Sequence, residues 1–144
     1  MIAFPLAPEE IPRVWNKVKP LIDKALVHNY GEQNSLDILE KLFKKQVVLF
    51  IGVEADEIMS ALIGEVLIHP RKKVFHITTW STKTGHDYDQ WMQLFDVVED
   101  FARGQSCTTI SAWTRKGLAK KLNWTHEFSV CLLYTSDAAD DLIG

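Results

Sequence analysis

The pattern of apolar and polar positions predicts strands and helices in a mixed order along the chain. It is clearest in residues 74–102, where a strand-like run leads through a polar loop into an amphipathic helix. The apolar stripe of that helix repeats at spacings of three and four, at Trp91, Leu94, Phe95, Val98, Phe101 and Ala102. We expect this stripe to pack on a sheet and the helix N-terminus to present free backbone N–H groups at the loop.

The first 45 residues predict an edge strand followed by helices. Ile2–Leu6 is a short apolar run whose proline is tolerated at a sheet edge. Helical spacing then runs from Pro8 to Leu26, and Pro20 is expected to divide it into two segments. Asn34 or Ser35 is expected to cap the next helix. The apolar stripe predicted for this helix is Leu36, Ile38, Leu39, Leu42 and Phe43.

Three strands are predicted next, at residues 47–53, 58–68 and 74–80. Their connections are too short for a crossover, so they should form an antiparallel meander. The first is nearly all apolar, as in a strand covered on both faces. Gly64 is a candidate for a bulge or a close approach of two chains.

The remaining elements follow the amphipathic helix, which is predicted at residues 87–103 with Gly104 as its C-terminal stop. A fifth strand is expected at residues 108–114, and the long helix before it permits parallel pairing with the meander. Residues 116–122 predict a short helix, and residues 128–133 predict a last strand.

Composition excludes several classes of function. The 144 residues fit one domain, and a net charge of −3 gives no electrostatic reason for a nucleic-acid partner. No apolar run reaches the roughly 20 residues of a membrane span. Cys107 and Cys131 fit neither a disulfide framework nor a metal site. We therefore expect no metal, no nucleic acid and no membrane among the partners.

The C-terminal residues need a separate interpretation. Residues 131–141, CLLYTSDAADD, look like the conceptual translation of a sequencing adapter. This predicts a domain over residues 1–130, a non-native tail over residues 131–144, and a metagenomic source for a chain truncated near Val130. The alternative is a natural acidic tail.

The order of elements over residues 2–130 resembles the GNAT (Gcn5-related N-acetyltransferase) fold. The segments that carry the resemblance are PRVW at 12–15, KPLI at 19–22, PRKK at 70–73, DQW at 89–91 and RKGLA at 115–119. The chain looks most like small proteins of tailed phages, some of which are acetyltransferases while others are related to internal virion proteins. The resemblance implies an α+β fold with a mixed, mostly antiparallel central sheet flanked by helices.

The resemblance also implies a binding site. Acetyl-CoA would lie in a V between the fourth and fifth strands, with its pyrophosphate at the loop after the fourth strand. The implied cofactor-binding residues are Trp80, Ser81, Thr82, Lys83, Thr84, Gly85 and His86. The loop departs from the family signature because it keeps one glycine, and Asp87 and Asp89 would repel a diphosphate. The position of the family's tyrosine acid falls on Ala119.

Two residues are candidates for the general base that an acyl transfer to an amine requires. Glu65 lies among apolar residues in the second strand of the meander, and His76 lies in the third. The alternatives are a solvated, outward-facing Glu65 and a hydrogen-bonded structural His76. Cys107 has no cationic neighbour in the sequence and is expected to be a buried thiol.

Two functions follow from the resemblance. The first is an N-acetyltransferase that moves an acetyl group from acetyl-CoA to an unknown small-molecule or protein amine. The alternative is a catalytically degenerate GNAT-fold phage protein that acts as a virion or interaction component. The expected location is the cytoplasm of a bacterial host cell or the virion.

The adapter interpretation predicts that residues 135–144 contribute little to stability, because such a sequence was never selected to fit a core. Deleting them should change the free energy of unfolding by less than about 0.5 kcal/mol, which urea denaturation of both chains would measure. A loss of several kcal/mol would contradict the interpretation.

Overall fold

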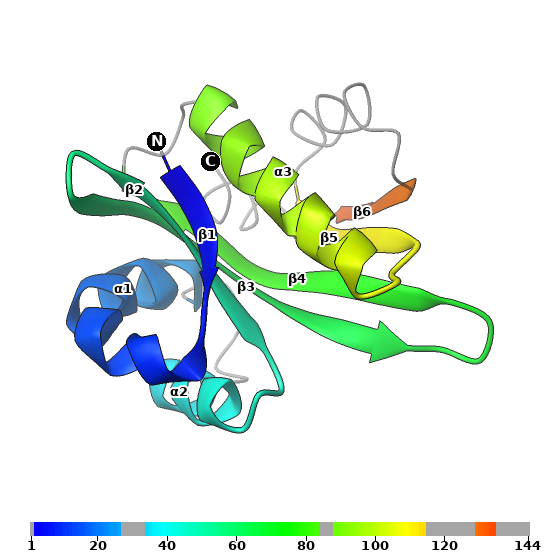
Figure 1. The fold of residues 1–144 in the computed structure, drawn as a ribbon, viewed down its shortest axis with the longest axis horizontal. Coiled ribbons are helices and arrows are strands. Elements are labelled where there is room, and N and C mark those ends of the chain that lie inside the picture. Colours follow the sequence, from blue (N-terminus) through cyan, green and yellow to red (C-terminus); the bar gives the residue numbers. More distant parts are fainter. Residues whose placement is uncertain (1, 27–33, 84–87, 115–128, 135–144) are drawn as a thin grey trace.

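The computed structural model describes residues 2–26, 34–83, 88–114 and 129–134 (Figure 1). The strands are β1 (Ile2–Leu6), β2 (Val48–Glu54), β3 (Glu57–Ile68), β4 (Lys73–Thr82), β5 (Thr109–Thr114) and β6 (Ser129–Tyr134). The helices are η1 (Pro8–Glu10), a 3-10 turn, and α1 (Ile11–Leu26), α2 (Ser35–Phe43) and α3 (Tyr88–Gly104). Every predicted strand is therefore present. The short helix predicted at 116–122 lies outside the described residues.

The strands form one six-stranded sheet in chain order, β1 to β6. β1 through β4 pair antiparallel, whereas β4 with β5 and β5 with β6 pair parallel. α1 and α2 lie on one face of the sheet and α3 lies on the other (Figure 1). The predicted mixed, mostly antiparallel sheet flanked by helices is confirmed. The predicted domain boundary at residue 130 falls within β6.

Alternation along the strands builds one hydrophobic core on each face. On β2, Leu49 and Ile51 pack with α1 and α2, while Phe50 packs beneath α3. The core beneath α3 includes Leu62, Phe75, Ile77, Trp80, Leu94, Phe95, Val98, Ala102, Ile110 and Ala112. β2 is thus covered on both faces, as predicted. Within the described residues, no helix is long and apolar enough to cross a membrane.

The expected division of the first helix at Pro20 is wrong, because α1 runs through it without interruption. Buried residues on both sides of the proline, Val18 and Leu21 among them, lie on one stripe against the sheet. This packing outweighs the lost main-chain hydrogen bond. Pro20 and Asn16 are both exposed, so water can reach the Asn16 carbonyl that the missing N–H leaves without a donor.

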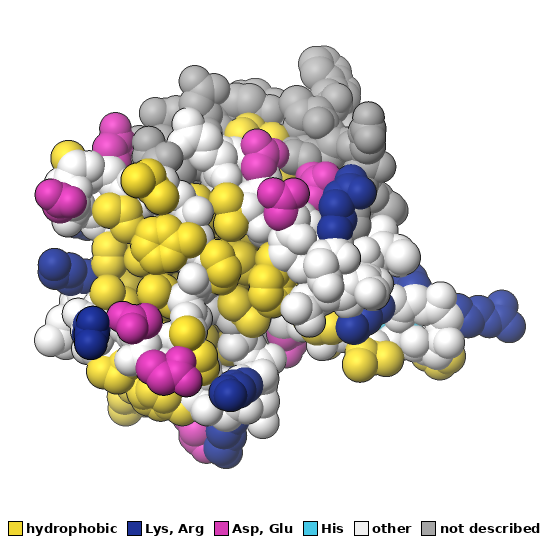
Figure 2. All heavy atoms as spheres, viewed as in Figure 1, with side chains coloured by type: hydrophobic (Ala, Val, Ile, Leu, Met, Phe, Trp, Pro, Cys, Tyr) yellow, Lys and Arg dark blue, Asp and Glu magenta, His cyan; other side chains and the backbone are white. Residues whose placement is uncertain are grey.

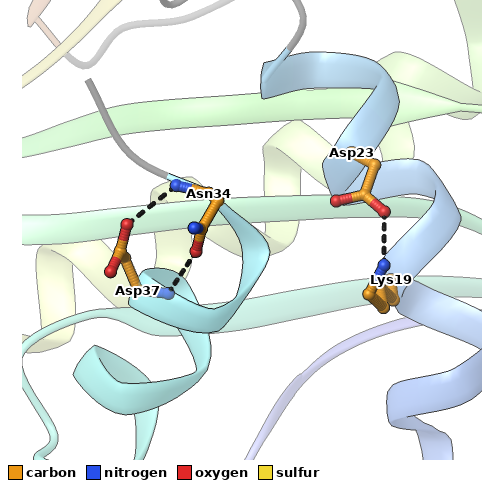
Figure 3. Close-up of polar contacts among 4 residues, drawn as sticks. All are labelled: Lys19, Asp23, Asn34 and Asp37. Carbon is orange, nitrogen blue, oxygen red and sulfur yellow. Dashed lines mark hydrogen bonds and ion pairs between the residues drawn. The ribbon is translucent and has the colours of Figure 1, made fainter. Parts of the chain in front are cut away.

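The second helix begins as predicted. Asn34 is the N-cap of α2, and its Oδ1 accepts from the Asp37 N–H at 3.0 Å. Asp37 Oδ2 accepts from the Asn34 N–H at 2.9 Å, which completes a capping box (Figure 3). On α1, Lys19 pairs with Asp23 one turn later at 2.8 Å (Figure 3).

Some apolar residues remain at the surface. On α2, Ile38 and Leu42 are buried, but Leu36 and Phe43 from the predicted stripe are 65% and 50% exposed. Nine residues make only two and a half turns, so a stripe of five is wider than the face that meets the sheet. Hydrophobic side chains also gather over β1 and the adjoining part of α1 (Figure 2).

The stop of α3 differs in detail from the prediction. Gly104 is the last helical residue, and the left-handed conformation falls on Ser106, with a φ of 64°. The Cys107 N–H donates to the Ala102 carbonyl at 2.9 Å, which closes the helix end. The chain therefore turns away from the helix axis at a serine, two residues beyond the glycine.

Gly64 marks the predicted close approach. A Cβ atom built on it would lie inside van der Waals contact of the Phe75 ring and 3.2 Å from the His76 carbonyl oxygen. The Phe75 ring is fully buried and held by edge-to-face contacts with Phe50 and Phe101, so it has little room to yield.

We therefore predict that Gly64→Ala destabilises the protein by about 1–3 kcal/mol through overpacking. Gly104→Ala is the matched control, because a Cβ atom there meets nothing within 4 Å. It should leave stability unchanged or raise it by up to about 1 kcal/mol, since alanine favours a helix over glycine. Urea denaturation of the three proteins would measure both changes. Equal stability of Gly64→Ala and the original chain would refute the close approach.

Candidate functional site

Strands β4 and β5 separate partway along their length. Their parallel ladder runs from Val74 opposite Thr109 to Ile77 opposite Ala112 and ends there. β4 continues to Thr82, while β5 continues to Thr114 with β6 as its partner. Within the described residues, the edge of β4 from Thr78 to Thr82 therefore has no strand beside it on the β5 side. A sheet that opens in this way offers main-chain N–H and C=O groups to an extended ligand.

A β-bulge lies at the point of separation. Ile63 pairs with Thr79 and Gly64 pairs with Ile77, which leaves Thr78 as the extra residue on β4. The Thr78 hydroxyl donates to the Ile63 carbonyl at 3.1 Å. A bulge bends its strand and increases the local twist, so it accounts for the departure of β4 from β5.

Three polar side chains form a row across the sheet just before the bulge. His76 on β4 pairs with Glu65 on β3 and with Ser111 on β5, so all three occupy one register step. His76 Nδ1 lies 2.8 Å from Ser111 Oγ, within hydrogen-bond distance. All three residues are half-buried. This polar row lies on the α1 and α2 face, because its strand neighbours Phe75 and Ile110 belong to the core beneath α3.

The electrostatics of the row favour a neutral imidazole. Partial burial lowers the pKa of His76 below its ordinary value, and the nearby Glu65 carboxylate opposes this effect without cancelling it. A neutral histidine at physiological pH is able to accept a proton. The two predicted candidates for a general base are thus neighbours, and Ser111 joins them as a residue that the sequence did not single out.

The residues implied for cofactor binding have different surroundings. Trp80 is buried in the core beneath α3 and stacks on Phe95 at 5.9 Å between ring centroids. Ser81 and Thr82 are also buried. Lys83 is exposed and forms an ion pair with Glu57 on β3. Thr84, Gly85 and His86 lie outside the described residues, as do Asp87 and Ala119.

A groove of about 560 Å³ adjoins the end of β4. It lies between α1 and the β2–β3 turn, and its lining includes Lys17, Lys24 and Lys83 together with Asp56 and Glu57. Lys24 Nζ donates to the Thr82 carbonyl at 3.1 Å, which ties α1 to this end of β4. The groove has mixed charge, so it does not by itself indicate the charge of a ligand.

The described residues show no group of three or more histidine, cysteine, aspartate or glutamate side chains that would hold a metal. Cys107 is buried, as predicted, and burial raises the pKa of its thiol against an opposing effect of Lys73. A thiol of this kind is a poor nucleophile. Among the described residues, the polar row remains the candidate for acid–base chemistry.

Comparison with solved structures finds acetyltransferases with a similar fold. The chain aligns with a protein described as a probable acetyltransferase at a TM-score of 0.69 and 15% identity, over 89% of this chain and 90% of that one. It aligns with the aminoglycoside acetyltransferase meta-AAC0020 from an uncultured soil metagenomic sample, solved in complex with sisomicin, at a TM-score of 0.62 and 15% identity. That alignment covers 94% of this chain and 95% of the other.

A third structure, a predicted acetyltransferase from Clostridium acetobutylicum, contains acetyl-CoA. It aligns at a TM-score of 0.58 and 15% identity, over 89% of this chain and 90% of that one. No family model matches the sequence, and no curated protein matches it. At these identities the likeness establishes the architecture, and the chain has the mixed α+β fold of the GNAT acetyltransferases.

Proposed function

We propose that this chain is an N-acetyltransferase that transfers an acetyl group from acetyl-CoA to a small amine. The observation that carries the proposal is the position of the polar row, one register step before β4 and β5 separate. A thioester held in the opening would have its carbonyl beside a neutral imidazole. The acetyltransferases of the same fold, one with acetyl-CoA and one with an aminoglycoside, support this choice of chemistry.

The residues at the opening suit acetyl-CoA. The edge of β4 from Thr78 to Thr82, which has no β5 partner among the described residues, would hydrogen-bond the amides of its pantetheine arm, as a strand would. The Ser81 Oγ is buried without a hydrogen-bond partner among the described residues, so a polar atom is still available at this end of β4. The start of α3 at Tyr88 would favour the negative charge of the pyrophosphate.

The reaction needs a proton acceptor. The amine nitrogen attacks the acetyl carbonyl, an N–C bond forms, the C–S bond breaks, and CoA leaves as the thiol. Simple amines are protonated at neutral pH, so a group on the enzyme must take a proton before or during attack. His76 fits this role because burial keeps it neutral, and the Glu65 carboxylate would stabilise the imidazolium that forms.

The first prediction from this proposal concerns binding. Acetyl-CoA should bind with a Kd of about 0.1–1 mM, or about 4–5.5 kcal/mol, because Asp87 and Asp89 would repel its diphosphate in an otherwise favourable niche. Isothermal titration would measure this affinity. No heat at millimolar acetyl-CoA, with folded protein, would favour the alternative of a non-catalytic interaction protein.

Two lysine variants sharpen the titration. Lys83→Ala should weaken binding no more than a few-fold if Lys83 leaves Glu57 to contact the phosphates. Lys44→Ala is the matched control, because Lys44 also loses an exposed ion pair, with Glu40, but lies at the end of α2. Equal affinities for the two variants would exclude a phosphate contact by Lys83.

The second prediction concerns pH. The transfer rate should fall as pH drops through the pKa of His76, because protonation removes the acceptor. Glu65→Gln removes the charge that raises this pKa, so the acidic limb of the rate profile should move to lower pH. Thiol release from acetyl-CoA with sisomicin as acceptor would be measured across pH. Glu40→Gln, which removes an exposed carboxylate on α2, is the control and should leave the limb in place. A limb that moves to higher pH in Glu65→Gln would refute the assignment.

A further inference from the structure

The contact with Ser111 orients the His76 ring within the polar row. His76 uses Nδ1 toward Ser111 on β5, at 2.8 Å. The opposite edge of an imidazole, Cδ2 and Nε2, then faces the other neighbouring strand. That strand is β3, where Glu65 is the register partner of His76. Among the described residues, Glu65 supplies the charge that acts on His76.

The negative charge of Glu65 selects one of the two neutral tautomers. A neutral imidazole carries a single N–H, and a carboxylate favours the tautomer whose proton is on its own side. The charge of Glu65 therefore favours the His76 tautomer with its proton on Nε2. In that tautomer Nδ1 is an acceptor, and the 2.8 Å contact is a hydrogen bond donated by the Ser111 hydroxyl.

This assignment changes which atom meets the substrate. In this tautomer Nε2 already carries a proton and Nδ1 accepts from Ser111, so neither ring nitrogen takes a proton directly from an amine. The Ser111 hydroxyl points its hydrogen at Nδ1, so the lone pairs of Oγ remain available to accept a proton. Ser111 is half-buried, and its neighbour Ala112 is the last residue of β5 that pairs with β4. Its oxygen therefore lies on β5, one register step before the opening.

We propose that Ser111 is a proton relay for the acetyl transfer: its Oγ takes the proton from the acceptor amine and passes its own proton to Nδ1 of His76. An N–H bond of the amine breaks and a new Oγ–H bond forms, while the original Oγ–H bond breaks and an Nδ1–H bond forms. The serine ends neutral and the histidine ends as an imidazolium beside Glu65. This inference rests on the proposed acetyltransferase function.

The tautomer is tested on the free protein, without acetyl-CoA. Nitrogen-15 NMR distinguishes the two neutral imidazole tautomers, and the His76 signals are assigned by their loss in His76→Gln. We expect the Nε2–H form in the original chain, and a shift of the Nδ1 resonance in Ser111→Ala, which removes the donor. A neutral His76 with its proton on Nδ1 would overturn the proposal, because Ser111 would then be the acceptor.

The relay is tested by rate. Ser111→Ala should lower kcat by about 10²- to 10⁴-fold, the usual contribution of a proton-transfer group, with an unchanged Kd for acetyl-CoA. Ser111→Thr keeps the hydroxyl on a β-branched side chain that suits a strand, and it should recover most of the rate. Thr109→Val is the matched control: it removes a hydroxyl from the same face of β5, opposite Val74, and should keep kcat.

The outcomes separate this inference from the function on which it rests. Normal turnover in Ser111→Ala, with acetyl-CoA and sisomicin as substrates, would overturn the relay and leave the acetyltransferase intact. An original chain that binds no acetyl-CoA and releases no thiol would overturn both. A similar loss in Thr109→Val and Ser111→Ala would show a structural effect of the strand and would also overturn the relay.

Discussion

The extra residue at Thr78 is the constraint on which both the core and the candidate site depend. Side chains alternate along a strand, so a regular β4 would place Trp80 on the same face as His76. The bulge shifts the alternation by one residue, and Trp80 instead joins Phe75 and Ile77 in the core beneath α3. The same shift leaves His76 on the opposite face, outside that core.

Gly64 makes this irregularity possible. Beside the bulge the Phe75 ring lies against the glycine, and any side chain at position 64 would occupy the space of that ring. The Thr78 hydroxyl satisfies the Ile63 carbonyl beside it, so the distortion keeps a polar partner for that group. Beyond the bulge β4 departs from β5, and the sheet opens next to the polar row.

The sequence predicted the positions of the strands and helices better than it predicted how they pack against one another. Apolar periodicity located every strand within one or two residues, and Gly64 was recognised because an isolated glycine in a strand often marks a bulge or a close approach. The division at Pro20 was wrong because a local rule was outweighed by packing of the whole helix on the sheet. The α2 stripe was too wide because periodicity does not state how much of a short helix a sheet covers.

The site was predictable only in part, for a related reason. Glu65 and His76 were chosen as polar residues within apolar strands, which is a property of each strand alone. Their pairing depends on the register that runs from the turn between β3 and β4, and a shift of one residue would place them on opposite faces. Ser111 was missed because it reaches His76 through a parallel pairing of residues 35 positions apart, across α3. No local pattern encodes that register.

The balance between burial and charge decides what the polar row can do. In water, Glu65 beside His76 would favour an imidazolium and leave no acceptor for a proton. In the sheet, desolvation disfavours the charged ring more strongly than one half-buried carboxylate favours it, and the pKa of His76 falls. The Glu65 carboxylate therefore leaves His76 neutral before the reaction. It stabilises the imidazolium that forms beside it when His76 takes a proton. The half-buried polar row meets two requirements, because its imidazole stays neutral and an amine is still able to reach it. Full exposure would remove the desolvation that keeps the ring neutral, and full burial would exclude the amine.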